Sequence, residues 1–258
     1  MQASPNLGWT GVPFDVSENS ELRCARIKKT ILLGTMSDTE TTALLSSETV
    51  AESTPARKRP KPGERRVQIL QALATMLEQP GAERITTAAL AAKLGVSEAA
   101  LYRHFASKAQ MFEGLIEFIE QTVFSLVNQI AERESVAQVA SPTEANGARQ
   151  AGKIVTMLVQ FAEKNPGMTR VMVGDALVFE NERLQQRMNQ FFDKVESTLK
   201  QCLRHGAPES DTPTVDAQVA ASALTAFLAG RLQRFARSGF KRMPSEHLDA
   251  CLARMLPN

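Results

Sequence analysis

The stretch that decides the fold is "ITTAALAAKLGVSEAALYRHFASKAQMFEGL", residues 85–115. Its first half repeats apolar residues at helical spacing, with Leu90, Ala91 and Leu94 on one face. This spacing predicts a short helix whose N-terminus Thr86 or Thr87 caps. Gly95 then supplies a turn, because glycine tolerates the left-handed backbone that ends many helices.

A second short helix is predicted over 98–104, with Ser97 as its cap. Two short helices joined by a glycine turn form a helix-turn-helix. This unit presents the N-terminal part of its second helix to the major groove of DNA, and the N-terminus of its first helix to a phosphate. The predicted DNA-contacting residues are Thr86, Thr87, Ser97, Glu98, Ala99, Ala100, Tyr102, Arg103, His104 and Lys108.

The end of the second helix admits two interpretations. In the first, Tyr102, the only tyrosine in the chain, and His104 direct their polar tips toward phosphates. In the second, Tyr102 is an ordinary half-buried aromatic and His104 is a solvated histidine. Leu101 and Phe105 are the better core candidates. The spacing of polar residues around them favours a nucleic-acid surface over a packed core.

The rest of the folded chain has a helical pattern. A helix is predicted from Glu64, and Ser107 with Gln110 forms a capping-box pattern that starts a long helix. The period breaks at 132–148, which predicts a loop. Further helices are predicted at 149–164, 167–176, 179–204, 215–238 and 245–255. No strand pattern is present, so the predicted fold class is all-α.

Composition agrees with packed helices, because 43% of the 258 residues are hydrophobic and only 5% are aromatic. The net charge of +2 is too small to make the whole chain a polycation, so any basic function must be local. Three distant cysteines show no metal-ligand spacing. No apolar run approaches the roughly 18–20 residues that span a bilayer. We therefore expect a cytoplasmic protein with no membrane, metal or cofactor partner.

The N-terminal part differs from the rest in composition. Residues 1–56 lack a sustained period and are rich in Ser, Thr and Glu, so we expect a disordered extension. The run "RKRPKPGERR" at 57–66 follows and contains six basic residues. It is either a solvated linker or an arm that neutralises phosphates, and we expect a basic arm over 57–63.

The C-terminal helices suggest dimerisation. The 215–238 helix has a broad apolar surface rich in small residues, which would let another helix approach closely. With the 179–204 helix it would build a four-helix dimer bundle. The expected interface residues are Leu224, Phe227, Leu228 and Phe235. The charged residues of the 179–204 segment, Glu180, Glu182, Arg183 and Arg187, are interpreted as a solvated helix face. Four methionines at 157, 168, 172 and 188 favour core packing over a ligand pocket.

The quoted stretch closely resembles the signature of TetR-type DNA-binding proteins, in which the second helix ends in Tyr-x-His-Phe followed by Ser-Lys. The resemblance covers about residues 64–111 and implies a three-helix helix-turn-helix domain there. It further implies an α-helical dimerisation and partner-binding domain over 112–258, and a homodimer whose two second helices read a palindromic DNA site.

A narrower resemblance joins the quoted stretch to "KNPGMTRVMVGDALVFENERLQQRMNQFF" and "RSGFKRMP", over about residues 64–245. Together they resemble the nucleoid occlusion factors of the TetR family. This resemblance implies a nucleoid-associated inhibitor of cell division that antagonises FtsZ when bound to chromosomal palindromes. It implies an FtsZ-tail site at Phe118, Lys164 and Asn165, although Leu126 and Gln160 depart from the residues expected beside it. Phe118 as plain core is the alternative.

Two function classes remain open from the sequence. The first is the DNA-dependent division inhibitor, and the second is a TetR-type, ligand-responsive transcriptional repressor on the same fold. An enzyme is not expected, because no convergent group of acids, histidines or cysteines suggests a catalytic site.

Overall fold

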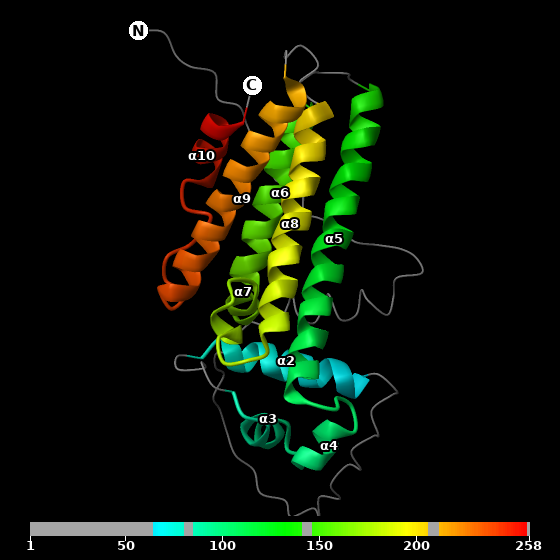
Figure 1. Cartoon of the computed structure of the whole chain (residues 1–258), viewed down its shortest axis with the longest axis vertical. Coiled ribbons are helices and arrows are strands. Elements are labelled where there is room, and N and C mark those ends of the chain that lie inside the picture. Colours follow the sequence, from blue (N-terminus) through cyan, green and yellow to red (C-terminus); the bar gives the residue numbers. More distant parts are fainter. Residues whose placement is uncertain (1–63, 80–84, 141–145, 206–211, 257–258) are drawn as a thin grey trace, which may run out of the picture. The chain divides into compact units, whose positions relative to one another are not determined.

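The computed structural model describes residues 64–79, 85–140, 146–205 and 212–256, all within one compact unit. Every regular element in these ranges is helical, which confirms the predicted all-α class (Figure 1). The predicted extension at 1–56 and the basic arm at 57–63 lie outside the described residues. The elements are α2 (Glu64–Leu77), α3 (Thr87–Leu94), α4 (Glu98–Tyr102), α5 (Lys108–Ala140), α6 (Asn146–Lys164), α7 (Pro166–Met172), the 3-10 turn η2 (Asp175–Leu177), α8 (Glu182–His205), α9 (Pro213–Arg237) and α10 (Leu248–Met255).

The first three described helices share a small core. Leu73 and Leu77 of α2 are buried, as are Leu90 of α3 and Leu101 of α4. Phe105, in the turn after α4, is also buried, so Leu101 and Phe105 are core residues as predicted. Each large apolar side chain buried here contributes about 1.5–3 kcal/mol, which is the main force that holds such short helices.

The long helices α5, α6, α8 and α9 run alongside one another, and α3 and α4 lie on the opposite side of α2 from them (Figure 1). The four long helices bury apolar stripes against each other, and α8 packs against α9 over much of its length. Buried members of this core include Leu115, Ile119, Val123, Ile154, Leu158, Phe191, Val195, Leu199, Leu224, Leu228 and Leu232.

The loop predicted at 132–148 is wrong in its extent, because α5 continues to Ala140 and α6 begins at Asn146. Glu134 of α5 explains part of the difference. Its carboxylate accepts hydrogen bonds from Arg149 Nε at 2.8 Å and from Lys153 Nζ, both on α6. Burial alone would raise the pKa of Glu134, but these hydrogen bonds outweigh it and hold the pKa below its usual value. Long-range charge pairing therefore supports helix where the apolar period fades.

The junction between the helix-turn-helix and the long helices is built by α2 and α7. Pro166 occupies the first position of α7, where its missing N–H costs nothing. Thr169 Oγ1 donates to Ala162 O at 2.9 Å, which fixes α7 to the end of α6. Gly167 of α7 then packs against the backbone of Ala74 in α2.

The predicted solvated face at 180–187 is also wrong in part, because two of its residues form contacts across the chain. Arg187 Nη2 lies 2.6 Å from Glu120 Oε2 of α5, and Glu180 forms an ion pair with Lys108. The hydrogen bond with Glu120 raises the pKa of Arg187 above its ordinary value. These pairs connect the segment before and within α8 to α5.

Candidate nucleic-acid interface

The turn between α3 and α4 has the geometry that the sequence predicts. Thr86 is the N-cap of α3, and its side chain accepts a hydrogen bond from Ala89 N at 3.2 Å. Gly95 ends the helix with φ 64° and ψ 39°, and its N–H bonds back to the carbonyls of Ala91 and Ala92. Thr86 is exposed, so its hydroxyl hydrogen can still be donated to a phosphate while its oxygen caps the helix.

The start of α4 differs from the prediction in one bond. Ser97 occupies the N-cap position, but its side chain makes no capping hydrogen bond. Ser97, Glu98 and Ala99 are exposed, and Ala100 is half-buried. The exposed start of α4 therefore offers small side chains and a hydroxyl, which is what close approach to base edges requires.

Thr87 and Glu98 contact each other across the turn. Thr87 Oγ1 donates a hydrogen bond of 2.5 Å to Glu98 Oε2. Both residues are predicted to contact DNA separately, whereas the structure pairs them. The bond ties the first turn of α3 to the first turn of α4, and the Glu98 side chain remains exposed.

The end of α4 is exposed, as a DNA-facing position requires. Tyr102 is 45% exposed, and Arg103 and His104 are also exposed. Arg66 of α2 secures this end, because its Nη1 donates to His104 O at 3.0 Å and its guanidinium lies 4.2 Å from the Phe105 ring centroid. Tyr102 is thus accessible enough to meet a phosphate, and its exposure also fits the alternative of an ordinary half-buried aromatic.

Lys108 is less available than the sequence suggests, because its ammonium group is paired with Glu180. The helix that it begins is capped locally. Gln110 N donates to Ser107 Oγ at 3.1 Å, and Gln110 Oε1 accepts from Ala106 N at 2.8 Å, one residue before the predicted cap. The sequence offered no signal for the Lys108–Glu180 pair, since the two residues lie far apart along the chain.

The three residues predicted to contact FtsZ have different environments. Phe118 is half-buried on α5, and Lys164 is exposed at the end of α6. Asn165 is only 4% exposed, and its Nδ2 donates to Phe161 O at 2.8 Å. The side chain of Asn165 therefore bonds to a carbonyl in the last turn of α6 and is not available to a partner. This part of the prediction is corrected.

The predicted dimer residues need a similar correction. Leu224, Leu228 and Phe235 are buried within the single chain, where they face the other long helices, and Phe227 is half-buried. Side chains already covered in one copy cannot supply surface to a second copy. Of the four predicted residues, Phe227 therefore keeps accessible surface, and the other three do not. Because α9 has apolar residues on most of its circumference, its period did not show which face the chain itself covers.

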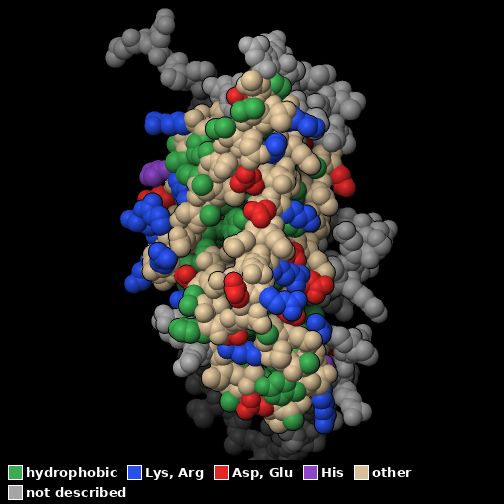
Figure 2. All heavy atoms as spheres, viewed as in Figure 1, with side chains coloured by type: hydrophobic (Ala, Val, Ile, Leu, Met, Phe, Trp, Pro, Cys, Tyr) green, Lys and Arg blue, Asp and Glu red, His purple; other side chains and the backbone are tan. Residues whose placement is uncertain are grey.

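The opposite face of α9 carries exposed apolar and small residues. Val215 and Val219 are 59% and 64% exposed, and the exposed small residues Ser222, Ala226 and Gly230 continue the same line at helical spacing. We call these five residues the α9 stripe. Figure 2 shows hydrophobic side chains gathered over the upper part of α9. The period of three to four residues was present in the sequence, but the larger leucines of the buried face gave a stronger signal.

The described ranges contain neither a metal-binding cluster nor a membrane-spanning helix. No three His, Cys, Asp or Glu residues gather there in a way that could hold a metal ion. Among the described helices, none is long and apolar enough to cross a bilayer.

Two family models match the chain. Residues 69–115 match the model described as bacterial regulatory proteins, tetR family. Residues 148–256 match a model described as tetracyclin repressor-like, C-terminal domain, of SlmA-like type. The first match spans the helix-turn-helix and the start of α5.

The chain is also similar over most of its length to known relatives. It is 50% identical over 187 residues to the nucleoid occlusion factor SlmA of Idiomarina loihiensis, covering 72% of this chain and 90% of that one. It is 48% identical over 187 residues to the SlmA of Vibrio cholerae, with the same two coverages.

Solved structures with similar folds have lower sequence identity. The transcriptional regulator FadR from Bacillus subtilis, in complex with stearoyl-CoA, matches with a TM-score of 0.56 at 13% identity, over 73% of this chain and 96% of that one. FadR from Bacillus halodurans matches with a TM-score of 0.55 at 16% identity, over 77% and 98%. These likenesses establish the fold alone.

Proposed function

The chain belongs to the SlmA nucleoid occlusion factors of the TetR family, and from this membership we propose that it binds palindromic chromosomal sites as a homodimer and, when bound, antagonises FtsZ assembly. The observation that carries the proposal is the exposed start of α4, which follows the glycine turn at Gly95. The sequence identity of 50% over 187 residues to one of these relatives supports it. On this proposal the protein acts as a regulator rather than an enzyme, in the cytoplasm and on the nucleoid.

DNA recognition is proposed to divide between the two short helices. Thr86 and the N-terminus of α3 contact a phosphate, because the free N–H groups and dipole of that helix end favour an anion. Ser97, Ala99 and Ala100 approach base edges in the major groove. Tyr102 contacts a neighbouring phosphate and sets the register of α4 on the duplex.

The homodimer is proposed to form through the α9 stripe together with the exposed face of α8. Ala226 and Gly230, at the end of the stripe, also line a cleft beside residues 238–247, so the interface is proposed to centre on Val215, Val219 and Ser222. Small residues at helical spacing let two helices approach closely. A two-fold axis beside α9 would give two copies of α4, one for each half of a palindrome.

FtsZ binding is proposed for the surface near Phe118 and Lys164. Lys164 is exposed and basic, which suits an acidic tail peptide. Phe118 is half-buried, so it can contribute an apolar contact while its base stays packed. Asn165 supports this surface by ending α6 rather than by touching the partner.

The test is sedimentation of FtsZ filaments with the protein and one of two duplexes, a selected palindrome or a scrambled duplex of equal length. We expect loss of pelleted FtsZ only with the palindrome. Thr86→Ala should remove this effect by weakening DNA binding, whereas Lys164→Glu should remove it while DNA binding stays intact.

The proposal fails if filament loss does not depend on the palindrome. If the protein leaves FtsZ unchanged in every mixture yet binds one palindrome specifically, it is a repressor of the TetR type instead. Far-UV circular dichroism of both variants controls for unfolding, since each substitution lies at an exposed position.

A further inference from the structure

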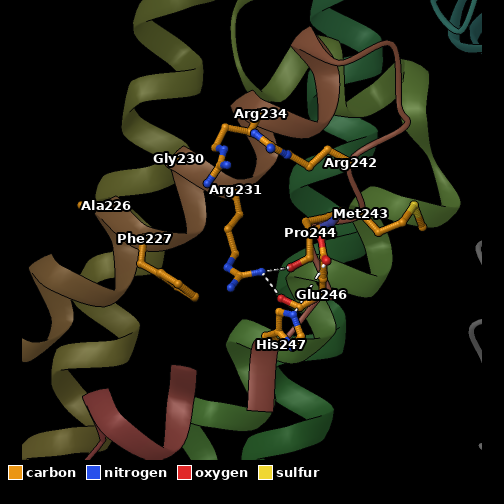
Figure 3. Close-up of a pocket in the computed structure, with 10 residues that line it drawn as sticks. All are labelled: Ala226, Phe227, Gly230, Arg231, Arg234, Arg242, Met243, Pro244, Glu246 and His247. Atoms are coloured by element: carbon orange, nitrogen blue, oxygen red, sulfur yellow. Dashed lines mark hydrogen bonds and ion pairs between the residues drawn. The ribbon is translucent and has the colours of Figure 1, made fainter. Parts of the chain in front are cut away.

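A cleft lies between α9 and the segment that connects it to α10. It has a volume of about 440 Å³, within the rough range of small-molecule sites. Its lining residues are Ala226, Phe227, Gly230, Arg231, Arg234, Arg242, Met243, Pro244, Glu246 and His247 (Figure 3). We call residues 238–247 the strap, because they cross from the end of α9 to the start of α10.

The strap is held by several hydrogen bonds. Arg231 Nη1 donates to Pro244 O at 2.7 Å and to Glu246 O at 2.8 Å, as Figure 3 shows. Ser245 N donates to Glu163 Oε1 of α6 at 2.9 Å. The cleft wall is therefore fixed before any ligand arrives, which reduces the entropic cost of binding.

The backbone of the strap is strained. Phe240 and His247 have φ values of 64° and 55°, and they are the non-glycine residues with positive φ in the described ranges. Such conformations cost on the order of 1–3 kcal/mol and concentrate at ligand sites and switches. Both residues belong to the strap, and His247 lines the cleft.

Three arginines give the cleft its charge. The exposed Arg242 extends toward the exposed Arg234 at the mouth of the cleft (Figure 3), and no described acidic side chain pairs with either. Two exposed cations on the rim of one cleft favour an anion over a cation as its occupant. Glu246 is the acidic side chain among the lining residues, and its carboxylate lies 3.8 Å from His247 Nε2.

Arg231 adds an unsatisfied donor and a ring contact. Its Nε is buried and has no hydrogen-bond partner, and its guanidinium lies 4.5 Å from the Phe227 ring centroid. Because this Nε is buried, a ligand in the cleft cannot reach it, and Nη1 and Nη2 already bond to Pro244 O, Glu246 O and Cys251 Sγ. Arg231 therefore supports the cleft wall and adds positive charge without a direct contact. Phe227 and Met243 supply apolar surface in the same cleft.

We propose that this cleft binds a small phosphorylated ligand with a ring, of the nucleoside monophosphate class. A phosphate monoester has about two negative charges and three acceptor oxygens, so it can bridge Arg234 and Arg242, whereas a carboxylate is satisfied by one arginine. The ring would lie against Phe227 and Met243. The cleft is open to solvent on one side, and its volume of about 440 Å³ suits a small molecule better than an extended peptide.

The test is titration calorimetry of the full-length protein with AMP, adenosine and inorganic phosphate as probes. AMP should bind more tightly than either of the others, because only AMP has both the phosphate and the ring. Combined replacement of Arg234 and Arg242 by alanine should weaken AMP binding by about tenfold or more, since two charge-assisted contacts are lost.

Arg237→Ala is the matched control, because Arg237 is exposed on the same helix but does not line the cleft. It should leave AMP binding unchanged. Arg242→Gln alone is the second variant, since its exposed side chain can be replaced without disturbing packing. Specific DNA binding of each variant confirms that it is folded.

Three results would overturn the assignment. The first is an absence of AMP binding at millimolar concentration, and the second is a loss of AMP affinity in Arg237→Ala as large as that in the double replacement. The third is a shift of the double variant from dimer to monomer, which would assign the arginines to acidic groups of a second copy.

Discussion

Gly167 of α7 touches the backbone of Ala74 in α2 so closely that a β-carbon at position 167 would lie 1.9 Å from the Ala74 carbonyl oxygen. The obstacle is backbone, not the end of a flexible side chain, so the two helices must move apart to admit any larger residue. This contact couples the helix-turn-helix to the long helices.

Gly167→Ala should therefore lower stability by about 1–3 kcal/mol and weaken binding to a palindrome. The melting temperature should fall by several degrees in differential scanning calorimetry. Gly152→Ala is the matched control in another helix, because its β-carbon would meet only the flexible Leu256 Cδ1 at 3.2 Å. Equal melting temperatures for the two variants would contradict the packing argument.

Glu98→Gln should tighten binding to non-specific DNA by roughly two- to fivefold, the scale of one exposed charge interaction. The substitution removes a negative charge near the duplex and weakens the bond that Thr87 donates to it. Fluorescence anisotropy with a scrambled duplex measures the change. Glu182→Gln, exposed at the start of α8, is the control and should show no effect.

Val219→Asp should shift the protein from dimer to monomer in sedimentation equilibrium at micromolar concentration. Val219 is 64% exposed on the α9 stripe, so a charge there would be desolvated only when two copies associate. Asn128→Asp adds the same charge at an exposed position on α5 and should leave the dimer intact. A dimer that survives the Val219 substitution places the interface elsewhere.

Glu134 should make stability depend on acid pH. Its pKa is lower in the folded chain than in the unfolded chain, so its contribution is present above the unfolded pKa and is lost as pH falls through the folded value. Urea unfolding should show wild type losing more stability than Glu134→Gln as the pH falls from about 5 to about 3, on either side of the ordinary glutamate pKa. At neutral pH the substitution should cost about 1–3 kcal/mol. Parallel pH profiles would rule out this role.

Cys202 should be unreactive toward thiol reagents in the native protein. Its burial raises the pKa to about 11, so almost no thiolate exists near neutral pH. In a variant with Cys24→Ser and Cys251→Ser, labelling at pH 8 should be slow and should become complete in denaturant. Rapid labelling of the folded variant would show that α8 opens readily.

The helix-turn-helix could be predicted because its bonds are local. Thr86 caps a residue three positions away, Gly95 closes the helix just before it, and Ser107 and Gln110 are three positions apart. Hydrogen bonds of such short range depend on neighbouring residues and on backbone conformation, both of which the sequence specifies directly.

The tertiary structure decided what is buried. α9 is apolar around most of its circumference, so its period could not distinguish the Leu224 face, which is buried, from the Val219 face, which remains exposed. Tertiary packing also decided that the Asn165 side chain is buried at the end of α6. It likewise decided that Lys108 forms an ion pair with Glu180. Burial and ion pairing depend on which helices, distant in the sequence, pack against each other. The free energy that favours one packing arrangement comes from contacts throughout the core and not from any single residue.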